Sequence, residues 1–471
     1  MMLHSSLTYA QFSGSLVNEY QLGNIPETLP RNLNTNYTRL NLQFKYKKWK
    51  AFTMLETFTT QYQQKSYFSP SQIGVYYTGN KFEFKLGNYF ETIGRGNLLR
   101  SFEIPSSILE DRAYRSRVYF FRDILGAQAK YKSKLADVKV LVGKPLDNLF
   151  PPIFTFDQRR PETVAALQTD LKYKKNKLGN AFMVLQNATS SSSYLTHYLS
   201  GNILPSVNFF TEYSYSIFDE TNSPTHAFYG GVNFTFHKLG GSFEVKDYKN
   251  FVLGTGINQP PALVREQTYK VLNRSIHVLQ PSNETGFQLE LFYELPNSQM
   301  LTFNQTGNKN NFGKEFYYTS SFLEYSKDWG KKQFKSFFDY ANDGIKNEKN
   351  RVSAGAQYEF IIYSNQKLKL ETEFQTMTRA TSQIINQVYG ITYHPVKSLS
   401  ITPQLEISND PFLTNTKNKF WLGGYVKYNA SQKLNFQLFA GKRRGGPACN
   451  AGICYEVLDF EGIELRANWR F

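Results

Sequence analysis

The chain closes with EGIELRANWRF, Glu461 to Phe471. From Ile463 onward every second position is apolar, and the positions between carry charged or amide side chains. The apolar set is Ile463, Leu465, Ala467, Trp469 and Phe471. Because successive side chains of a β-strand point to opposite faces, this pattern predicts a strand with one apolar and one charged face.

The same alternation recurs along the chain, for example in residues 39–46 and 368–374. Such segments return at roughly 20-residue intervals, and the connections between them are short and long in turn. We expect the short connections near residues 47–48, 79–80, 133–134, 174–177, 204–206, 238–240, 296–298, 329–331, 365–366, 395–397 and 430–432. Counting strands on both sides of these 11 turns, plus the first and last strands, predicts 24 strands with 12 longer loops.

Composition decides what kind of sheet this is. Aromatic residues make up 16% of the 471 residues, yet mean hydropathy is −0.47, and no run approaches the roughly 20 apolar residues of a spanning helix. Strands of a transmembrane barrel need only about 10 alternating residues, with aromatic girdles at both interfaces. A soluble propeller also has many short strands, but its blade repeat of about 40 to 50 residues is not visible.

The predicted fold is therefore all-β: a single closed antiparallel transmembrane β-barrel of about 24 strands over residues 11–471. We expect long extracellular loops, short periplasmic turns, both termini on the periplasmic side and no separate plug domain. Residues 1–10 lack the basic start and apolar centre of a secretory signal, although Thr8-Tyr9-Ala10 ends like a cleavage site. We interpret this segment as a signal-peptide remnant.

The aromatic carboxyl terminus resembles the signal by which outer-membrane assembly machinery recognises its substrates. Ile463, Leu465, Trp469 and Phe471 would form the terminal assembly strand, with Trp469 and Phe471 at the periplasmic interface. The expected location is the bacterial outer membrane, crossed many times. The expected partners are outer-membrane lipids and, during biogenesis, the assembly machinery.

A net charge of +16 could indicate nucleic-acid binding. The lysines, however, concentrate in short connections such as KYKKWK and DWGKKQ, where polar turns at a membrane surface explain them better. We expect no nucleic-acid partner. The six histidines are not paired at ligand spacing, so we expect no metal and no cofactor.

Cys449 and Cys454 lie in CNAGIC, within the last long loop. Four intervening residues allow the chain to reverse, which predicts a local disulfide in an oxidising compartment. We expect this loop to face the exterior.

A barrel of 24 strands is too wide for inward side chains to fill, so the lumen must be narrowed by loops, filled by a partner, flattened or left open. The longest loops, near residues 91–115, 145–162 and 249–285, contain apolar residues that need burial. We expect at least two of them to fold inward. Their opposed charges favour ion pairs that hold the loops inside the wall, or alternatively an eyelet that selects solutes. The candidate residues are Arg95, Arg100, Glu103, Asp111, Arg159, Arg160, Arg265, Glu266 and Arg274.

Enzyme signatures are absent from the sequence: there is no GxSxG motif and no persuasive Ser/His/Asp grouping. His277, the histidine beside charged residues in a long loop, is expected to have a hydrogen-bonded structural role. Two functions remain open. One is a channel or transporter restricted by its own loops. The other is a structural barrel that docks surface lipoproteins or other outer-membrane proteins in a secretion, assembly or uptake complex.

Four stretches together resemble an outer-membrane barrel family of Bacteroidota with no established activity. They are QFSGSLVNEYQ, GNYFETIGRGNLLRSFE, PPALVREQTYKVLNR and the closing RGGPACNAGIC. The resemblance spans essentially the whole chain. It implies a location in the outer membrane and leaves the mechanism open.

Overall fold

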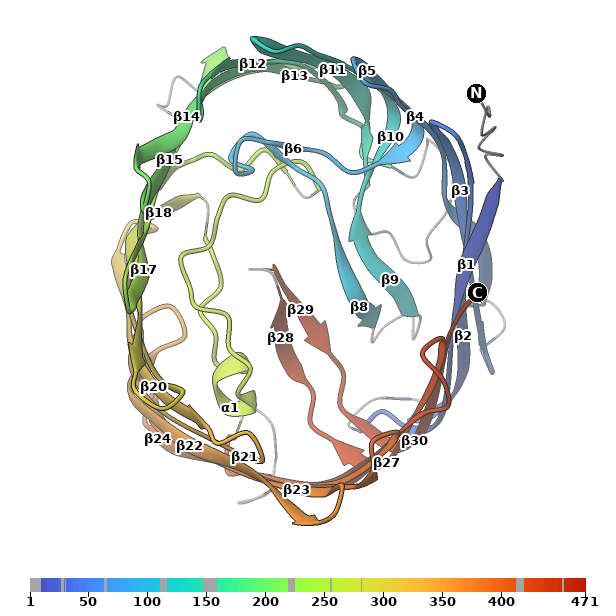
Figure 1. Ribbon diagram of the computed structural model, residues 1–471, viewed down its shortest axis with the longest axis vertical. Helices are drawn as coiled ribbons and strands as arrows, with labels where there is room; N and C mark the ends of the chain where they lie inside the picture. The colour runs from blue at the N-terminus through green and yellow to red at the C-terminus, as the bar shows by residue number, and fades with distance from the viewer. Residues whose placement is uncertain are drawn as a thin grey trace, which may run out of the picture.

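The computed structural model describes residues 10–471 apart from 27–28, 30, 63–65, 111–116, 147–158, 219–224, 255, 281, 412–418 and 451–452. Within them, 24 strands form one closed antiparallel sheet (Figure 1). In chain order the wall strands are β1 (Gln11–Asn24), β2 (Asn32–Tyr46), β3 (Trp49–Thr60), β4 (Tyr67–Thr78), β5 (Phe82–Tyr89), β10 (Ile124–Lys132), β11 (Ala136–Pro145), β12 (Thr163–Tyr173), β13 (Asn176–Gln186), β14 (Ser191–Leu204), β15 (Val207–Phe218), β16 (His226–Phe236), β17 (Leu239–Lys249), β18 (Asn283–Leu295), β19 (Gln299–Asn311), β20 (Glu315–Asp328), β21 (Lys332–Asp343), β22 (Glu348–Tyr363), β23 (Gln366–Arg379), β24 (Ser382–Val396), β25 (Leu399–Ser408), β26 (Lys419–Asn429), β27 (Leu434–Arg443) and β30 (Phe460–Arg470). The sequence prediction of a closed barrel with 24 strands is confirmed.

The two ends of the chain close the ring. Strand β1 pairs with β2 on one side and with β30 on the other, in a register that runs from Ser15 opposite Arg470 to Asn24 opposite Glu461. Beyond the last strand residue, Gly14 and Phe471 exchange two backbone hydrogen bonds of 3.0 Å. The alternating C-terminal stretch is thus the strand that completes the barrel.

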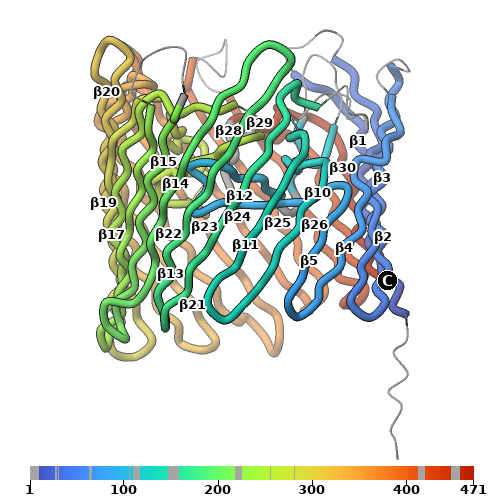
Figure 2. Tube along the Cα trace, turned by 90° about the horizontal axis from the view of Figure 1, so that it is seen from above, coloured from blue at the N-terminus to red at the C-terminus, as the bar shows by residue number. Residues whose placement is uncertain are grey.

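The short turns lie at one end of the barrel, and the carboxyl terminus lies at the same end (Figure 2). They fall where the sequence places them, within one or two residues. Residues such as Lys47 and Lys174 adopt positive φ values of 52° and 54° there, a conformation that matches the twist of two-residue hairpins. Within the described residues no helix has the length and apolarity to cross a bilayer.

Alternate side chains of the wall face outward and inward, as the closing strand shows. Ile463 is 50% exposed and Leu465 43%, whereas Glu464 between them is 3% exposed. The outer surface therefore presents apolar side chains around the ring. The inner surface carries most of the buried charged and amide groups.

Two rows of glycines cross neighbouring strands on the inner face. One row joins Gly74, Gly87, Gly126 and Gly143, and the other joins Gly23, Gly462, Gly441 and Gly423. At Gly87 φ is +95°, and a Cβ would lie 2.2 Å from the Ile73 carbonyl oxygen. Missing side chains at facing positions let adjacent backbones approach closely, as at a tight bend of a barrel.

Seven further elements lie inside the outline of the barrel (Figure 1). They are β6 (Thr92–Ile93), β7 (Leu99–Arg100), β8 (Phe102–Glu110), β9 (Arg117–Arg122), α1 (Lys270–Asn273), β28 (Gly446–Asn450) and β29 (Ile453–Val457). They belong to the connections β5–β10, β17–β18 and β27–β30. Two of the three longest loops predicted from the sequence therefore fold inward, together with the last loop, which we had expected to face the exterior.

One side of the lumen holds an apolar core. Loop residues Ile93, Leu98, Leu99, Phe251 and Ile257 pack there against inward side chains of the wall. The wall contributes Tyr89, Ile124, Leu141, Val164, Ala166, Ala181, Met183, Leu185, Tyr198, Ala227 and Tyr248. Strands β12 and β13 are consequently apolar on both faces over TVAAL and AFMVL, where the alternation weakens. We call this cluster the lumen core.

Candidate functional site

The connection between β17 and β18, residues 250–282, is the principal occupant of the lumen, and we call it the lumen loop. Helix α1 buries Val271 and Leu272 against the wall. Tyr269 stacks on Phe337 with ring centroids 3.9 Å apart, and its hydroxyl donates to Glu324 at 2.7 Å. An apolar anchor therefore fixes the turn of helix, with a polar contact at its edge.

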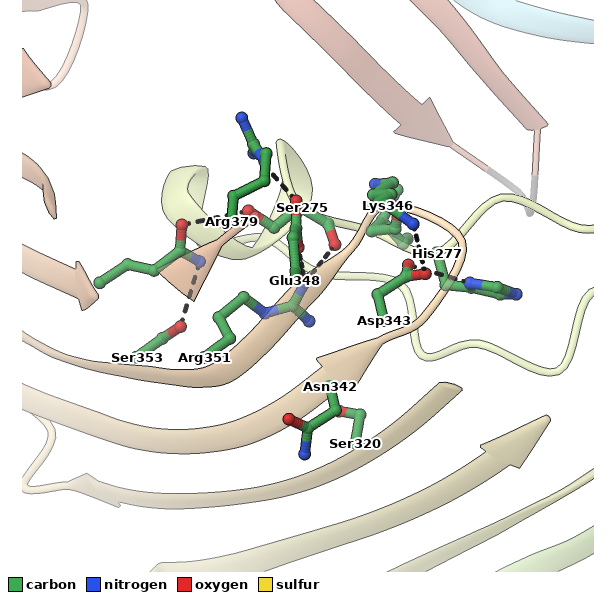
Figure 3. Close-up of polar contacts among 12 residues, drawn as sticks. Ser275, His277, Ser320, Asn342, Asp343, Lys346, Glu348, Arg351, Ser353 and Arg379 are labelled. Atoms are coloured by element: carbon green, nitrogen blue, oxygen red, sulfur yellow. Dashed lines mark hydrogen bonds and ion pairs between the residues drawn. The ribbon is translucent and has the colours of Figure 1, made fainter. Parts of the chain in front are cut away.

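A polar cluster, the loop clamp, holds the next residues of the lumen loop (Figure 3). Arg351 donates to the Ser275 carbonyl at 2.7 Å, and Lys346 donates to the Ile276 carbonyl at 2.6 Å. His277 Nδ1 lies 3.1 Å from Asp343. The loop supplies Ser275, Ile276 and His277, whereas the hairpin β21–β22 supplies the other three residues.

His277 is the titratable centre of this clamp. It is 3% exposed and stacks on Tyr318 with ring centroids 4.3 Å apart. Burial alone would lower the pKa of His277, but the hydrogen bond with Asp343 and the negative charges of Asp343 and Glu284, the latter 3.6 Å away, outweigh it and raise the pKa above its ordinary value. The predicted hydrogen bonding of His277 is present, and its structural role stays a prediction.

Arg274 makes the strongest side-chain link between lumen loop and wall. Its guanidinium donates to both carboxylate oxygens of Glu406, at 2.6 and 3.1 Å. Arg265 lies 3.6 Å from Glu290 and rests 4.2 Å above the Phe322 ring. Two-pronged guanidinium pairs of this kind add geometric specificity to charge attraction, so they fix the position of the loop.

The first inward segment carries three of the predicted charges. The backbone N–H of Arg95 donates to Glu212 at 2.5 Å, and its guanidinium lies 4.6 Å from the Phe210 ring centroid. Burial lowers the pKa of Arg100, and the negative charge of Glu266 in the lumen loop acts in the opposite direction. Glu103 accepts a hydrogen bond from Tyr119.

The second long loop is described only at its ends. Arg159 forms a buried ion pair with Asp123 at 2.7 Å. Arg160 donates to both carboxylate oxygens of Glu162, from Nε at 3.0 Å and from Nη2 at 2.9 Å. Asp111, predicted as a lumen charge, lies outside the described residues, as do residues 1–9 of the expected signal remnant.

Cys449 and Cys454 face each other across the β28–β29 hairpin as a directly paired set. Paired residues of antiparallel strands have Cα atoms about 4.5 to 5.5 Å apart, a separation that a disulfide can span. Their side chains lie outside the described part of the chain, so the disulfide stays a prediction. The exterior placement of this loop is wrong, because the hairpin folds into the barrel (Figure 1).

The predicted terminal residues lie on the outer face. Trp469 is 46% exposed, and its ring centroid is 4.9 Å from that of Phe471. Phe471 also lies 6.2 Å from Phe12 of β1. These rings form an aromatic patch at the short-turn end, where an interface girdle is expected.

Sequence reasoning missed the wall partners of the loops. Buried Glu348 and Arg351 and half-buried Arg379 form a chain of charges, with Glu348 at 3.1 Å from Arg351 and 2.9 Å from Arg379. Another network joins Arg117 of β9 to Glu19 at 2.7 Å. The available signal was the set of charged residues at inward strand positions, and this set does not reveal which loop atom each residue meets.

A family model described as a family of unknown function (DUF6029) matches residues 222–471, the part of the chain that holds the lumen loop and the closing strand. The chain belongs to this family. No curated protein matches the sequence of this DUF6029 member.

Solved structures share the barrel architecture at low identity. The translocation pore of the P pilus usher PapC covers 98% of this chain and 99% of its own length, with a TM-score of 0.51 and 7% identity. A chain of the E. coli P pilus tip assembly intermediate PapC-PapD-PapK-PapG gives 0.53 and 8%, over 99% of this chain and 62% of that chain. A BenF-like porin from Pseudomonas fluorescens Pf-5 gives 0.40 and 8%, over 98% of each. At these identities the likeness to the two PapC structures is one of fold.

The described residues of the site offer positioning and electrostatics. Among the described residues, no group of three or more His, Cys, Asp or Glu side chains is arranged to hold a metal ion. The buried charges instead pair loops with wall. The arrangement can restrict a lumen and give its open part a charge.

Proposed function

We propose that this DUF6029 member is an integral outer-membrane protein, crossing the membrane many times, that acts as a channel or transporter whose lumen is restricted by its own loops. The observation that carries the proposal is the docking of the lumen loop inside a closed 24-stranded wall. A barrel of this width without inward loops would leave a large aqueous opening. Apolar side chains on the outer face support insertion in a lipid bilayer.

The fold likeness to the PapC translocation pore is consistent with passage through the barrel. The lumen core fills one side of the interior, while the wall from β18 to β27 carries ionic groups. A solute would therefore pass along the charged, aqueous side of the lumen. Such a division suits a selective channel better than a wall that only supports other proteins.

Planar-bilayer recording tests the proposal with a deletion that the structure makes feasible. Asn250 and Ser282 already share a backbone hydrogen bond at the base of the lumen loop, and the β17–β18 ladder continues below them. Residues 252–280 can therefore be replaced by two glycines without breaking the wall. We expect this variant to show higher single-channel conductance than the intact chain and to sensitise cells to bulky antibiotics.

A matched control replaces Lys331 with Gln in an exposed short turn, where no restriction is altered. Fractionation of cells should place the intact protein and both variants in the outer membrane. If neither the intact nor the deleted form conducts, and lipoproteins copurify in mild detergent, the docking role is supported and the channel proposal fails.

A further inference from the structure

A cationic cavity lies in the lumen beneath the lumen loop. Its volume is about 600 Å³, within the range of roughly 300 to 1,000 Å³ that small-molecule sites occupy. Inward positions of β23 to β27 form its wall, and α1 with the start of the inner hairpin forms its roof. Lys427 and His394 lie near the short-turn ends of their strands, and Arg443 lies at the long-loop end of β27, so the cavity extends from the short-turn half of the lumen toward the inner hairpin.

Its lining carries a strong charge imbalance. Six cationic side chains line it, against one carboxylate, that of Glu406. The six are Lys270, Arg274, Lys369, Lys427, Arg443 and Arg444. Neighbouring acids neutralise part of this set, because Glu371 lies 3.1 Å from Lys369 and Glu464 lies 3.2 Å from Arg443. Asp410 and Asp459 also act on Arg444, so five carboxylates face the six cations and the cations remain in excess.

Two of the cations have no carboxylate partner in the described part of the chain. Lys427 makes no ion pair there, and its side chain is exposed to the lumen. Arg444 donates to the Asn386 amide oxygen at 3.1 Å, but its buried Nε has no hydrogen-bond partner among these residues. A buried donor without a partner costs free energy that an oxyanion could recover.

Arg444 and Arg274 also lie against each other. Arg274 donates to the Arg444 carbonyl at 3.3 Å. Burial, and after it the neighbouring Arg274 charge, lower the pKa of Arg444 to about 10. Bringing two guanidinium groups together is unfavourable unless an anion lies near both, and planar guanidinium forks suit carboxylate and phosphate oxygens.

We propose that this cavity is a binding site for small solutes bearing carboxylate or phosphate groups, and that it makes the lumen anion-selective. Lys427 attracts the solute from the short-turn side, and Arg444 completes its hydrogen bonding with Nε. The inference deepens the proposed channel function, and its selectivity part rests on that function. Its binding part can be measured without any conduction.

The binding test uses the full chain in detergent, titrated calorimetrically with inorganic phosphate and, separately, with succinate at constant ionic strength. We expect saturable binding of at least one of the two. Arg444→Gln should weaken it roughly tenfold or more, because a charge-assisted hydrogen bond is lost. Arg444→Lys should bind with intermediate affinity. Lys331→Gln removes an equal charge outside the cavity and should leave binding unchanged.

The selectivity test measures the reversal potential across a bilayer with a KCl gradient. We expect anion preference in the intact chain and a shift toward cations in Lys427→Glu, a change at an exposed position that should not disturb folding. If neither oxyanion shows saturable binding, the proposed site is wrong. Equal affinity of Arg444→Gln and the intact protein would also overturn it. A conducting chain without anion preference would overturn the selectivity and leave the channel proposal standing. A complete lack of conductance would count against the channel alone.

Discussion

Replacing Arg351 with methionine should release the lumen loop while the wall stays folded. Arg351 is 3% exposed, donates to the Ser275 carbonyl at 2.7 Å and to Glu348 at 3.1 Å, and forms an ion pair with Asp339 at 3.8 Å. In the variant, all three groups lose this cation in a buried place. When the loop opens, water can hydrate these groups, so the substitution stabilises the open loop relative to the closed one.

The magnitude follows from the partners that remain. Breaking a buried ion pair by removing one member costs about 3 to 5 kcal/mol. Glu348 keeps Arg379 at 2.9 Å, and Asp339 keeps the Ser320 hydroxyl at 2.8 Å, which places the cost at the lower end. A shift of about 3 kcal/mol would raise the open fraction of the loop on the order of a hundredfold.

Hydrogen exchange of backbone amides in residues 270–280 measures this opening directly. Arg351→Lys keeps the charge but loses the fork, so we expect a smaller increase in exchange. Lys349→Met changes an exposed position two residues away on the same strand, so its loop amides should exchange at the rate of the intact protein. Exchange in Arg351→Met that matches the intact protein would refute the idea that the loop clamp holds the lumen loop.

Three further predictions concern separate parts of the barrel. Because the folded pKa of His277 is raised, its contribution is complete below the ordinary value of about 6.5 and is lost as pH rises through the folded pKa. The protection factors of the loop amides, which correct for the intrinsic rise of exchange with pH, should therefore fall in mildly alkaline buffer, and His277→Gln should lack this fall. Gly87→Ala should lower folding yield and thermal stability, since a positive φ costs about 1 to 2 kcal/mol for alanine and the new Cβ meets a carbonyl 2.2 Å away, whereas Gly330→Ala in an open turn should carry only the φ cost. Mass spectrometry of unreduced peptides should show two hydrogens lost between Cys449 and Cys454, and alkylation of both sulfurs without reductant would contradict the disulfide.

The barrel wall could be predicted from the sequence because its signals are local. Every outward side chain meets the same apolar surroundings, so a strand such as Leu368 to Phe374 shows its alternation without reference to any other strand. Turn residues such as Lys174 mark the ends of strands in the same local way. Strand number and closure then follow from counting.

The interior could not be predicted as well, because its partners are distant in the chain. Arg274 meets Glu406 across 132 positions, and Arg351 meets Ser275 across 76. The sequence identifies Arg274 as a loop charge, but no local pattern selects Glu406 among the inward acids of the wall. The inward course of the last loop was missed for the same reason, since the charges around Arg443 and Arg444 suit a lumen and an exterior equally well.

The division of the lumen, however, does have a sequence signal. On β12 the inward positions Val164 and Ala166 are apolar, and the outward face of the strand is apolar too. A strand with one face in contact with water would instead carry polar side chains on that face. On β23 the inward positions are Lys369, Glu371 and Glu373, which stay favourable only beside water or opposite charges. Strands apolar on both faces therefore mark where loops dock. Strands with ionic inner faces mark where the proposed channel would pass a solute, and the cationic cavity lies against such strands.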